Sequence, residues 1–401
     1  MRIALLADES LPSGTRVHSK MMHELAVEFQ RNDHSCVIIS PGSLKQKNLL
    51  EVVYHEGVEI WLFKSGKIRG LGMLNRVLNE WLIPYRAWKA ISTEADNYNF
   101  DLCINYSPTI FFGPLAKKFK KNGAYIYLVL RDMFPKWLID EGIIYNNSPS
   151  AFFLRKYEKI NYDVADCIGV MSKKNLDLFL ELNPSYSNVS ILMNWVSTRS
   201  LNFPVTKSNI IKKYNLSDKV IFFYGGNLGR SNDMPNLIRL AKNLHNYKDA
   251  HFLIIGQGDQ VDKIIKLKNS WNLKNLTILP SVSQDEYKEI LKHIDVGLFT
   301  LSKKHSSHNF PGKLLGYMLQ SKPILGSVNP QNDLSELIND AEAGCVFVNG
   351  EDKNLAKAAL MLAQSPDLRL DMGEKARLLL DKHFSVESAV QNIIFEKNKK
   401  K

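Results

Sequence analysis

Residues 220–230 have the sequence VIFFYGGNLGR, an apolar run of strand length that leads into three glycines and an arginine. A helix is predicted at 235–244, and the order strand, glycine-rich turn and helix is typical of a parallel α/β sheet. Glycines let a backbone approach a phosphate closely, and Arg230 adds positive charge. The spacing fits neither a Walker A loop nor a GxGxxG fingerprint, and close packing of the helix on the sheet is the other explanation for the glycines. The stretch therefore predicts the start of a Rossmann-like domain with a candidate phosphate turn.

The same alternation of apolar runs and helical stretches extends along the whole chain. Before the polar segment 197–215, strands are predicted at 3–7, 36–40, 102–105, 124–130, 167–171 and 189–193. After it, the strand at 220–224 is followed by others at 251–255, 276–279, 296–300, 324–326 and 345–348. This pattern predicts an α/β fold of two doubly wound, Rossmann-like domains, 1–198 and 199–385, that face a central cleft.

Composition narrows the class of protein. The 401 residues are 45% hydrophobic and 23% charged, as in a globular protein, and no apolar run reaches the roughly 20 residues of a membrane span. No secretory signal is recognised, so we expect a cytoplasmic protein. The four cysteines are far apart, which argues against a disulfide framework or a zinc site and favours apolar core positions. The net charge of +11 suits an anionic membrane or phosphate ligands, whereas no nucleic-acid-binding motif is present.

Four further motifs are candidates for chemistry. The turn at 12–16 (PSGTR) and the turn at 256–258 (GQG) each follow a predicted strand, and ordinary turns are the alternative for both. The segment 308–313 (HNFPGK) precedes an apolar helix, and Lys313 would bring a full charge to an anion there. Asp132 follows the strand 124–130, where a carboxylate would hold or deprotonate an acceptor hydroxyl; a structural Arg131–Asp132 pair is the alternative.

Two segments suggest a membrane surface, each with a simpler alternative. Residues 70–91 have apolar side chains at helical spacing beside basic ones, with Pro84 expected to bend the helix, and they predict either a core helix or a helix that docks on acidic lipid. The apolar positions are Leu71, Leu74, Leu78, Trp81, Tyr85 and Trp88, and the basic ones are Arg69, Arg76, Arg86 and Lys89. The basic end at 395–401 is either a solvated tail or a further attraction to such a surface.

Taken together, these motifs resemble the family 4 retaining glycosyltransferases of GT-B fold. The most similar members are bacterial O-antigen and capsule N-acetyl-L-fucosamine transferases. The resemblance extends from residue 2 to about 384, and its most specific pieces are 15–26 (TRVHSKMMHELA), 131–137 (RDMFPKW), 165–172 (ADCIGVMS), 192–195 (LMNW), 225–229 (GGNLG) and 308–313 (HNFPGK).

The resemblance implies a hexosyltransferase that moves a sugar from a UDP-linked donor onto a polyprenyl-diphosphate-linked glycan at the inner face of the cytoplasmic membrane. The sequence shows no cluster of metal ligands and no Asp-x-Asp motif, so we expect transfer without a metal or other cofactor. The first domain would bind the acceptor, the helix 386–401 would pack back on it, and the second domain would bind the donor. The implied catalytic residues are Asp132, Arg230 and Lys313. The implied donor-binding residues are Ser13, Gly14, Thr15, Gly225, Gly226, Asn227, Gly229, Gly256, Gly258, Val282, His308, Asn309, Pro311 and Gly312. The implied acceptor-binding residues are Arg16, His18, Arg131 and Trp137.

The sequence also departs from the wider family at charged positions. Asn227 and Asn232 stand where many members have Arg and Lys, and His308 and Gly316 stand where many have two Glu residues. Two alternatives therefore remain open: a nucleotide-sugar-binding subunit that needs a catalytic partner, and a nucleotide-sugar epimerase of GT-B architecture.

Overall fold

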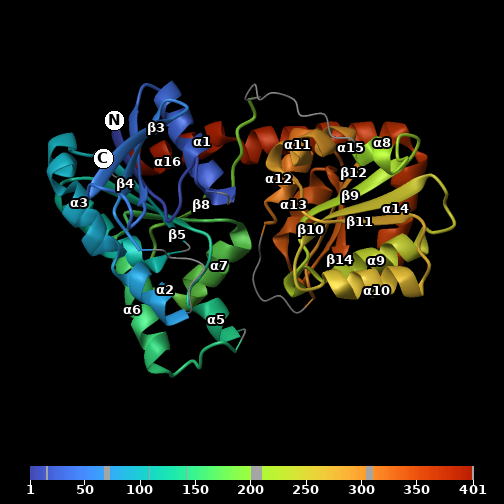
Figure 1. Cartoon of the computed structure of the whole chain (residues 1–401), viewed down its shortest axis with the longest axis horizontal. Coiled ribbons are helices and arrows are strands. Elements are labelled where there is room, and N and C mark those ends of the chain that lie inside the picture. Colours follow the sequence, from blue (N-terminus) through green and yellow to red (C-terminus); the bar gives the residue numbers. More distant parts are fainter. Residues whose placement is uncertain are drawn as a thin grey trace. The chain divides into compact units, whose positions relative to one another are not determined.

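The computed structural model describes residues 1–14, 17–66, 73–107, 109–140, 142–199, 210–303 and 310–399. Four predicted site residues, Thr15, Arg16, His308 and Asn309, lie outside this part. The chain divides into two compact units (Figure 1): Met1–Ser197 with Val386–Lys401, and Thr198–Ser385.

The first unit is built on a sheet with the strand order β3-β4-β2-β1-β5-β6-β7-β8, in which only β3 runs antiparallel to its neighbour. Its strands are β1 (Arg2–Leu6), β2 (Ser35–Pro41), β3 (Leu50–His55), β4 (Val58–Phe63), β5 (Leu102–Ser107), β6 (Tyr125–Leu130), β7 (Cys167–Val170) and β8 (Val189–Ile191). The unit's helical segments are α1 (Val17–Arg31), α2 (Met73–Trp81), α3 (Ile83–Tyr98), η1 (Ile110–Phe112), α4 (Gly113–Lys121), α5 (Lys136–Asp140), α6 (Pro149–Val164), α7 (Lys173–Leu182) and α16 (Val386–Asn398).

Apolar clusters cover both faces of this sheet. Phe29 of α1 and Ile393 of α16 belong to one cluster, and Ile83 of α3 and Phe119 of α4 belong to the other. The central strands are buried on both sides because they are apolar along their whole length. Cys36, Cys103 and Cys167 are free and buried in this core, as predicted.

The hairpin of β3 and β4 was not predicted. Half-buried and exposed side chains alternate along most of β3, whereas β4 is mostly buried, and the strands are joined at Glu56 and Gly57, which have positive φ angles of 47° and 82°. In the segment 70–91, α2 and α3 are separated at Leu82, before Pro84 as expected. Ile83 of α3 is buried and Trp88 packs against the core, whereas Leu78 of α2 and Tyr85 of α3 are 51% and 60% exposed, so part of the stripe is core and part is surface.

The second unit is a parallel sheet in the order β11-β10-β9-β12-β13-β14. Its strands are β9 (Val220–Asn227), β10 (Ala250–Gln257), β11 (Leu276–Leu279), β12 (Val296–Thr300), β13 (Ile324–Val328) and β14 (Gly344–Val348). Its helical segments are α8 (Ile210–Lys213), η2 (Arg230–Asn232), α9 (Met234–Asn243), α10 (Val261–Ser270), α11 (Gln284–His293), α12 (Lys313–Leu319), α13 (Asp333–Asp340), α14 (Asp352–Gln364) and α15 (Pro366–His383). Two Rossmann-like α/β units, as predicted, therefore make up the described chain.

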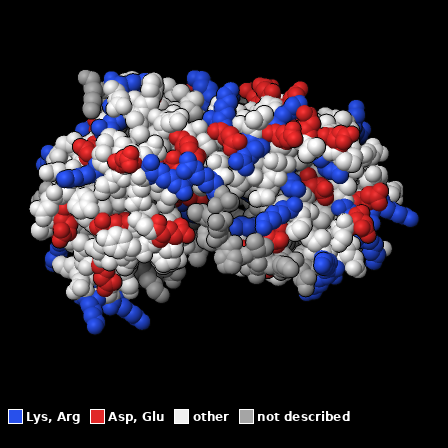
Figure 2. All heavy atoms as spheres, turned by 90° about the horizontal axis from the view of Figure 1, so that it is seen from above, with Lys and Arg blue, Asp and Glu red and all other residues white. Residues whose placement is uncertain are grey.

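Charged side chains of both signs are interspersed on the face shown in Figure 2. Several form local pairs on one helix, such as Lys159 with Asp163 and Arg377 with Asp381. The basic excess of the sequence is therefore not gathered into a single block on this face. None of the helices in the described part is long and apolar enough to cross a bilayer.

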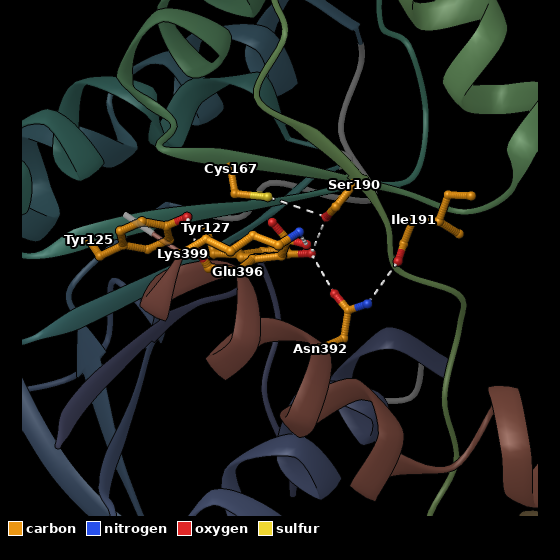
Figure 3. Close-up of polar contacts among 8 residues, drawn as sticks. All are labelled: Tyr125, Tyr127, Cys167, Ser190, Ile191, Asn392, Glu396 and Lys399. Atoms are coloured by element: carbon orange, nitrogen blue, oxygen red, sulfur yellow. Dashed lines mark hydrogen bonds and ion pairs between the residues drawn. The ribbon is translucent and has the colours of Figure 1, made fainter. Parts of the chain in front are cut away.

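The last helix, α16, is fastened to the first unit by polar contacts as well as by its apolar face (Figure 3). Asn392 donates a hydrogen bond of 3.2 Å to the carbonyl of Ile191 and accepts one of 3.4 Å from Tyr127. The Tyr127 hydroxyl also lies 3.0 Å from Ser190 Oγ, and Tyr125 donates to the carbonyl of Glu396. The end of the chain thus completes the sheet unit that begins at residue 1.

Candidate functional site

The carboxyl ends of β9, β10, β11 and β12 lie at one edge of the second sheet, because these strands are parallel. Ligands of doubly wound sheets bind at this edge. The loops after β9 and β12 are joined by a hydrogen bond from the Ser302 amide to the Ser231 carbonyl, 2.8 Å long. The loops after β9 and β10 are joined by a bond from the Leu228 amide to the Gln257 carbonyl, 2.9 Å long.

Gly226 and Lys313 meet at this edge. Gly226 is exposed and has a φ angle of 135°, which a residue with a side chain rarely adopts. A Cβ atom on Gly226 would stand 3.6 Å from Lys313 Nζ, so the ammonium group lies directly beside the bare backbone at the strand end. Exposed backbone next to a lysine is a suitable place for a phosphate group.

The surroundings of Lys313 leave its ammonium group able to bind an anion. Its Nζ lies 3.5 Å from the centre of the Tyr224 ring, and the described residues offer it no carboxylate partner. Desolvation lowers the pKa of Lys313 to about 7. A bound anion would favour the charged ammonium form and so raise this pKa again.

Tyr317 anchors α12, the helix that begins at Lys313, to the sheet, and it was not predicted as a site residue. It lies one turn after Lys313 on α12, and its buried hydroxyl is 3.1 Å from the Leu298 carbonyl of β12 and 3.2 Å from the Phe223 carbonyl of β9. A Cβ on Gly297 would come within 2.3 Å of the Tyr317 ring. The signal in the sequence was a tyrosine four residues after the lysine within an apolar helix.

Other predicted glycines have a packing explanation. A Cβ on Gly256 would stand 1.8 Å from the Gly226 carbonyl oxygen, and one on Gly258 would stand 2.5 Å from Leu228. A Cβ on Gly225 would meet the Tyr287 ring at 2.3 Å, and one on Gly229 would meet Asn227 at 2.8 Å. These glycines allow the loops to approach each other closely, so they shape the strand edge on which Gly226 is left open.

The remaining residues predicted in this unit are spread along the same loops. Arg230 is not paired with the Lys313 site. Its side chain is 84% exposed and forms an ion pair of 2.9 Å with Asp259, which partly neutralises its charge. Asn227 is exposed, and its carbonyl accepts a hydrogen bond from Tyr224. Val282 is half-buried in the loop after β11.

Pro311 and Gly312 form the half-buried turn into α12. Phe310, which precedes them, packs on Phe384 with ring centres 4.5 Å apart. This contact anchors the start of the turn that ends at Lys313.

The corresponding edge of the first sheet gathers a second polar cluster. His18 of α1 and Asp8, which follows β1, are both buried, with Nε2 and Oδ1 2.9 Å apart. The His18 ring stacks on Tyr106 at the end of β5, with centres 5.4 Å apart. Desolvation raises the pKa of Tyr106 to about 12, so its hydroxyl keeps its proton. Asp8 and Tyr106 were not predicted as site residues.

The first loop places its two described residues differently. Ser13 is exposed, whereas Gly14 is buried and donates a hydrogen bond of 2.8 Å to the Ser10 carbonyl. A Cβ on Gly14 would stand 2.7 Å from Ser19 Oγ, so close packing accounts for this glycine.

Arg131 does not offer its charge to a ligand, in contrast to its predicted acceptor-binding role. Its guanidinium is buried and donates to the carbonyls of Leu192 and Met193, at 2.8 and 3.3 Å. It also lies 5.4 Å from the centre of the Trp195 ring. Arg131 therefore fixes the segment after β8, as in the structural alternative for the Arg131–Asp132 pair.

Asp132, the next residue, is exposed beside a small cavity. The cavity measures about 10 Å³, enough for a single water molecule, and Glu158 of α6 also lines it. Desolvation raises the pKa of Glu158 to about 7, although Tyr162 donates a hydrogen bond of 2.8 Å to it. Glu158 was not predicted, since nothing in the sequence places it near Asp132. The side chain of Trp137, on α5, is outside the described part.

Comparison with known proteins agrees with this architecture. Residues 206–379 match the family model described as "Glycosyl transferases group 1". The probable glycosyltransferase WbjE of Pseudomonas aeruginosa is 26% identical over 54% of this chain and 54% of its own length. The putative colanic acid biosynthesis glycosyl transferase WcaI of Escherichia coli K12 is 22% identical over 70% of this chain and 68% of its own. The chain thus spans about half the length of WbjE and two thirds of WcaI.

Among solved structures, an α,α-trehalose-phosphate synthase (UDP-forming) from Burkholderia xenovorans superposes with a TM-score of 0.73. The alignment covers 99% of this chain and 100% of that one at 11% identity, and so shows the fold alone. The predicted GT-B fold is confirmed, and residues 206–379 within it match the group 1 glycosyltransferase model.

Proposed function

We propose that this chain is a retaining glycosyltransferase that takes its sugar from a nucleotide diphosphate donor held at the Gly226–Lys313 edge of the second unit. The observation that carries the proposal is the half-buried Lys313, set beside bare backbone at a strand end. Burial without an anion lowers the pKa of the lysine to about 7, and a bound diphosphate would favour its charged form. The match of residues 206–379 to the group 1 glycosyltransferases supports the same assignment.

Departure of the sugar builds negative charge on the diphosphate, and Lys313 would stabilise that charge as the glycosidic bond breaks. The acceptor hydroxyl would attack from the face that the diphosphate leaves, and its proton would pass to the departing phosphate oxygen. No step needs a metal, because the lysine and the backbone amides provide the charge. Arg230 would contribute only after its pair with Asp259 rearranges.

The first unit would bind the acceptor. Its polar cluster, His18 with Asp8 and the exposed Asp132, lies where the strands of that sheet end. Asp132 would orient the acceptor hydroxyl rather than deprotonate it. His18 would present an imidazole whose position is fixed by Asp8 and Tyr106.

For the donor, uridine is the proposed base and N-acetyl-L-fucosamine the proposed sugar. Uridine is supported by the trehalose-phosphate synthase of the same fold, whose description is UDP-forming. The sugar rests on the motif resemblance. A lipid-linked surface-glycan acceptor is supported by WcaI, whose name assigns it to colanic acid biosynthesis.

Peripheral binding to the inner face of the cytoplasmic membrane completes the proposal. Apolar side chains of the first unit are exposed on α2, α3, α6 and the segment before α6: Leu78, Tyr85, Ile143, Tyr145, Phe152 and Phe153. Residues of α2, of α6 and of the segment before α6 pack with Phe111 in one cluster, and exposed Lys89 and Lys156 lie on α3 and α6. An apolar surface with flanking lysines is what an anionic bilayer binds.

Nucleotide release from a panel of nucleotide sugars, with and without a polyprenyl-diphosphate-linked acceptor, tests the proposal. We expect release that requires acceptor, and the active donor names the sugar. Isomerisation of the donor without acceptor would instead establish an epimerase, and donor binding without any turnover would point to a subunit that needs a catalytic partner. Sedimentation with anionic but not with neutral vesicles tests the membrane surface.

A further inference from the structure

Three potential metal ligands converge where the β3–β4 hairpin meets α1. They are His23 in the middle of α1, His55 at the end of β3 and Glu56 in the turn that follows. Each offers one ligand atom, and the three atoms lie within 4.8 Å of one another. This is the one such group of three among the residues that the structure describes.

The spacing approaches that of a zinc site. His23 Nε2 and Glu56 Oε2 are 3.1 Å apart, and two ligands of a tetrahedral zinc ion with bonds of about 2.0–2.1 Å lie roughly 3.3 Å apart. The two imidazole rings are 5.0 Å apart between centres. Since no two ligand atoms are more than 4.8 Å apart, no separation needs to close by more than about 1.5 Å to reach this spacing. The partners that can move are His55, which is half-buried, and Glu56, which is exposed in the turn.

Burial of His23 costs folding free energy that its structural contacts do not explain. It is 2% exposed, and its Nδ1 atom has no hydrogen-bond partner within the described chain. A buried polar atom without a partner costs free energy, and an apolar side chain would fill the same space without that cost. Hydrogen bonding of Nδ1 therefore does not explain why a histidine stands here, whereas its other nitrogen, Nε2, faces Glu56 in the cluster. The hairpin turn is already tied to α1 by the hydrogen bond from Gln30 Nε2 to the Gly57 carbonyl, so the hydrogen bond between His23 and Glu56 is not needed to hold it.

We propose that His23, His55 and Glu56 bind a zinc ion that fastens the β3–β4 hairpin to α1. Two imidazoles and a carboxylate are ligands that zinc accepts, and the fourth position would be taken by water. The site is separate from the donor-binding edge, since all three residues belong to the first unit. It does not depend on the proposed glycosyltransferase activity.

The test is calorimetric titration of the metal-free full chain with zinc chloride, with cobalt chloride as a coloured probe in parallel. We expect one zinc ion per chain, visible absorption bands from the cobalt form, and a higher melting temperature with zinc. His55→Ala and Glu56→Gln alter the accessible ligands and leave the core intact. Each should weaken zinc binding at least about tenfold and abolish the thermal shift, because even second-shell changes cost that much.

His245→Ala removes an exposed histidine of the second unit and serves as the matched control, with unchanged zinc affinity expected. The proposal is wrong if the wild-type chain takes up no zinc in a one-to-one ratio. It is equally wrong if both ligand variants bind zinc as tightly as the wild type.

Discussion

The affinity for a nucleotide sugar should fall as the pH rises above 7, because Lys313 must be protonated to hold the diphosphate. Burial lowers the pKa of the free lysine to about 7, whereas the bound anion favours the charged form. Binding therefore takes up a proton above pH 7. The affinity is therefore highest below pH 7. It falls as the pH rises from the pKa of the free lysine to the higher pKa of the lysine in the complex. For a free pKa of about 7, the dissociation constant should rise about tenfold per pH unit, or roughly 50-fold from pH 7 to pH 9.

Calorimetry with a UDP-sugar at several pH values measures this directly, since the diphosphate of a nucleotide sugar has no ionisation of its own in the range. Lys313→Met should weaken binding at pH 7 by about 10- to 100-fold, the value of a charge-assisted hydrogen bond, and remove the pH dependence. Lys313→Arg should bind with little pH dependence, because a guanidinium stays protonated. Lys266→Met, an exposed lysine on α10, is the control. A wild-type affinity that is constant between pH 7 and 9 would refute the reasoning.

Three other changes test the surrounding structure. Glu158→Gln should stabilise the protein against urea, relative to the wild type, more at pH 8 than at pH 4. The wild-type carboxyl has a pKa of about 4.5 in the unfolded chain and about 7 in the folded one, so the folded wild type loses up to roughly 3 kcal/mol of stability as the pH rises through this range. An equal effect at both pH values would contradict this. Gly256→Ala places a Cβ 1.8 Å from the Gly226 carbonyl oxygen, so it should lower stability by about 1–3 kcal/mol and weaken donor binding, as measured by melting and calorimetry. Asn392→Ala removes the bond to Ile191 and should cost about 1–2 kcal/mol in urea unfolding, with faster proteolysis of α16; unchanged proteolysis would argue against this anchoring.

The fold was predictable because its signal is local and repeated. Apolar runs of strand length alternate with helical stretches on both sides of the polar segment, and the buried strands are those runs. The hairpin at 50–63 was missed because its edge strand, β3, is half exposed and a glutamate interrupts each strand, which leaves apolar runs of only three and four residues. The stripe of 70–91 left a core helix and a surface helix open, because apolar spacing alone does not show that Leu78 and Tyr85 stay exposed while Trp88 packs against the core.

The candidate site was predictable in its parts and not in its arrangement. Gly226 and Lys313 each carried a signal, but their proximity depends on how α12 packs across β9 and β12 through Tyr317. Arg131 and Arg230 show the opposite limit. The sequence shows that each residue is charged. It does not show that backbone carbonyls already accept hydrogen bonds from Arg131, or that Asp259 already forms an ion pair with Arg230. Glu158 has an unusual pKa only because folding buries it beside the end of β6, which no spacing in the chain records.

The most direct test of the central claim is product analysis with the full chain, a nucleotide sugar and a lipid-linked acceptor, compared between wild type and Lys313→Met. The account predicts a glycosylated acceptor with the anomeric configuration of the donor, formed by the wild type and strongly reduced in the variant. A product of inverted configuration would contradict the retaining mechanism. Equal turnover by wild type and variant would contradict the role of the Gly226–Lys313 edge.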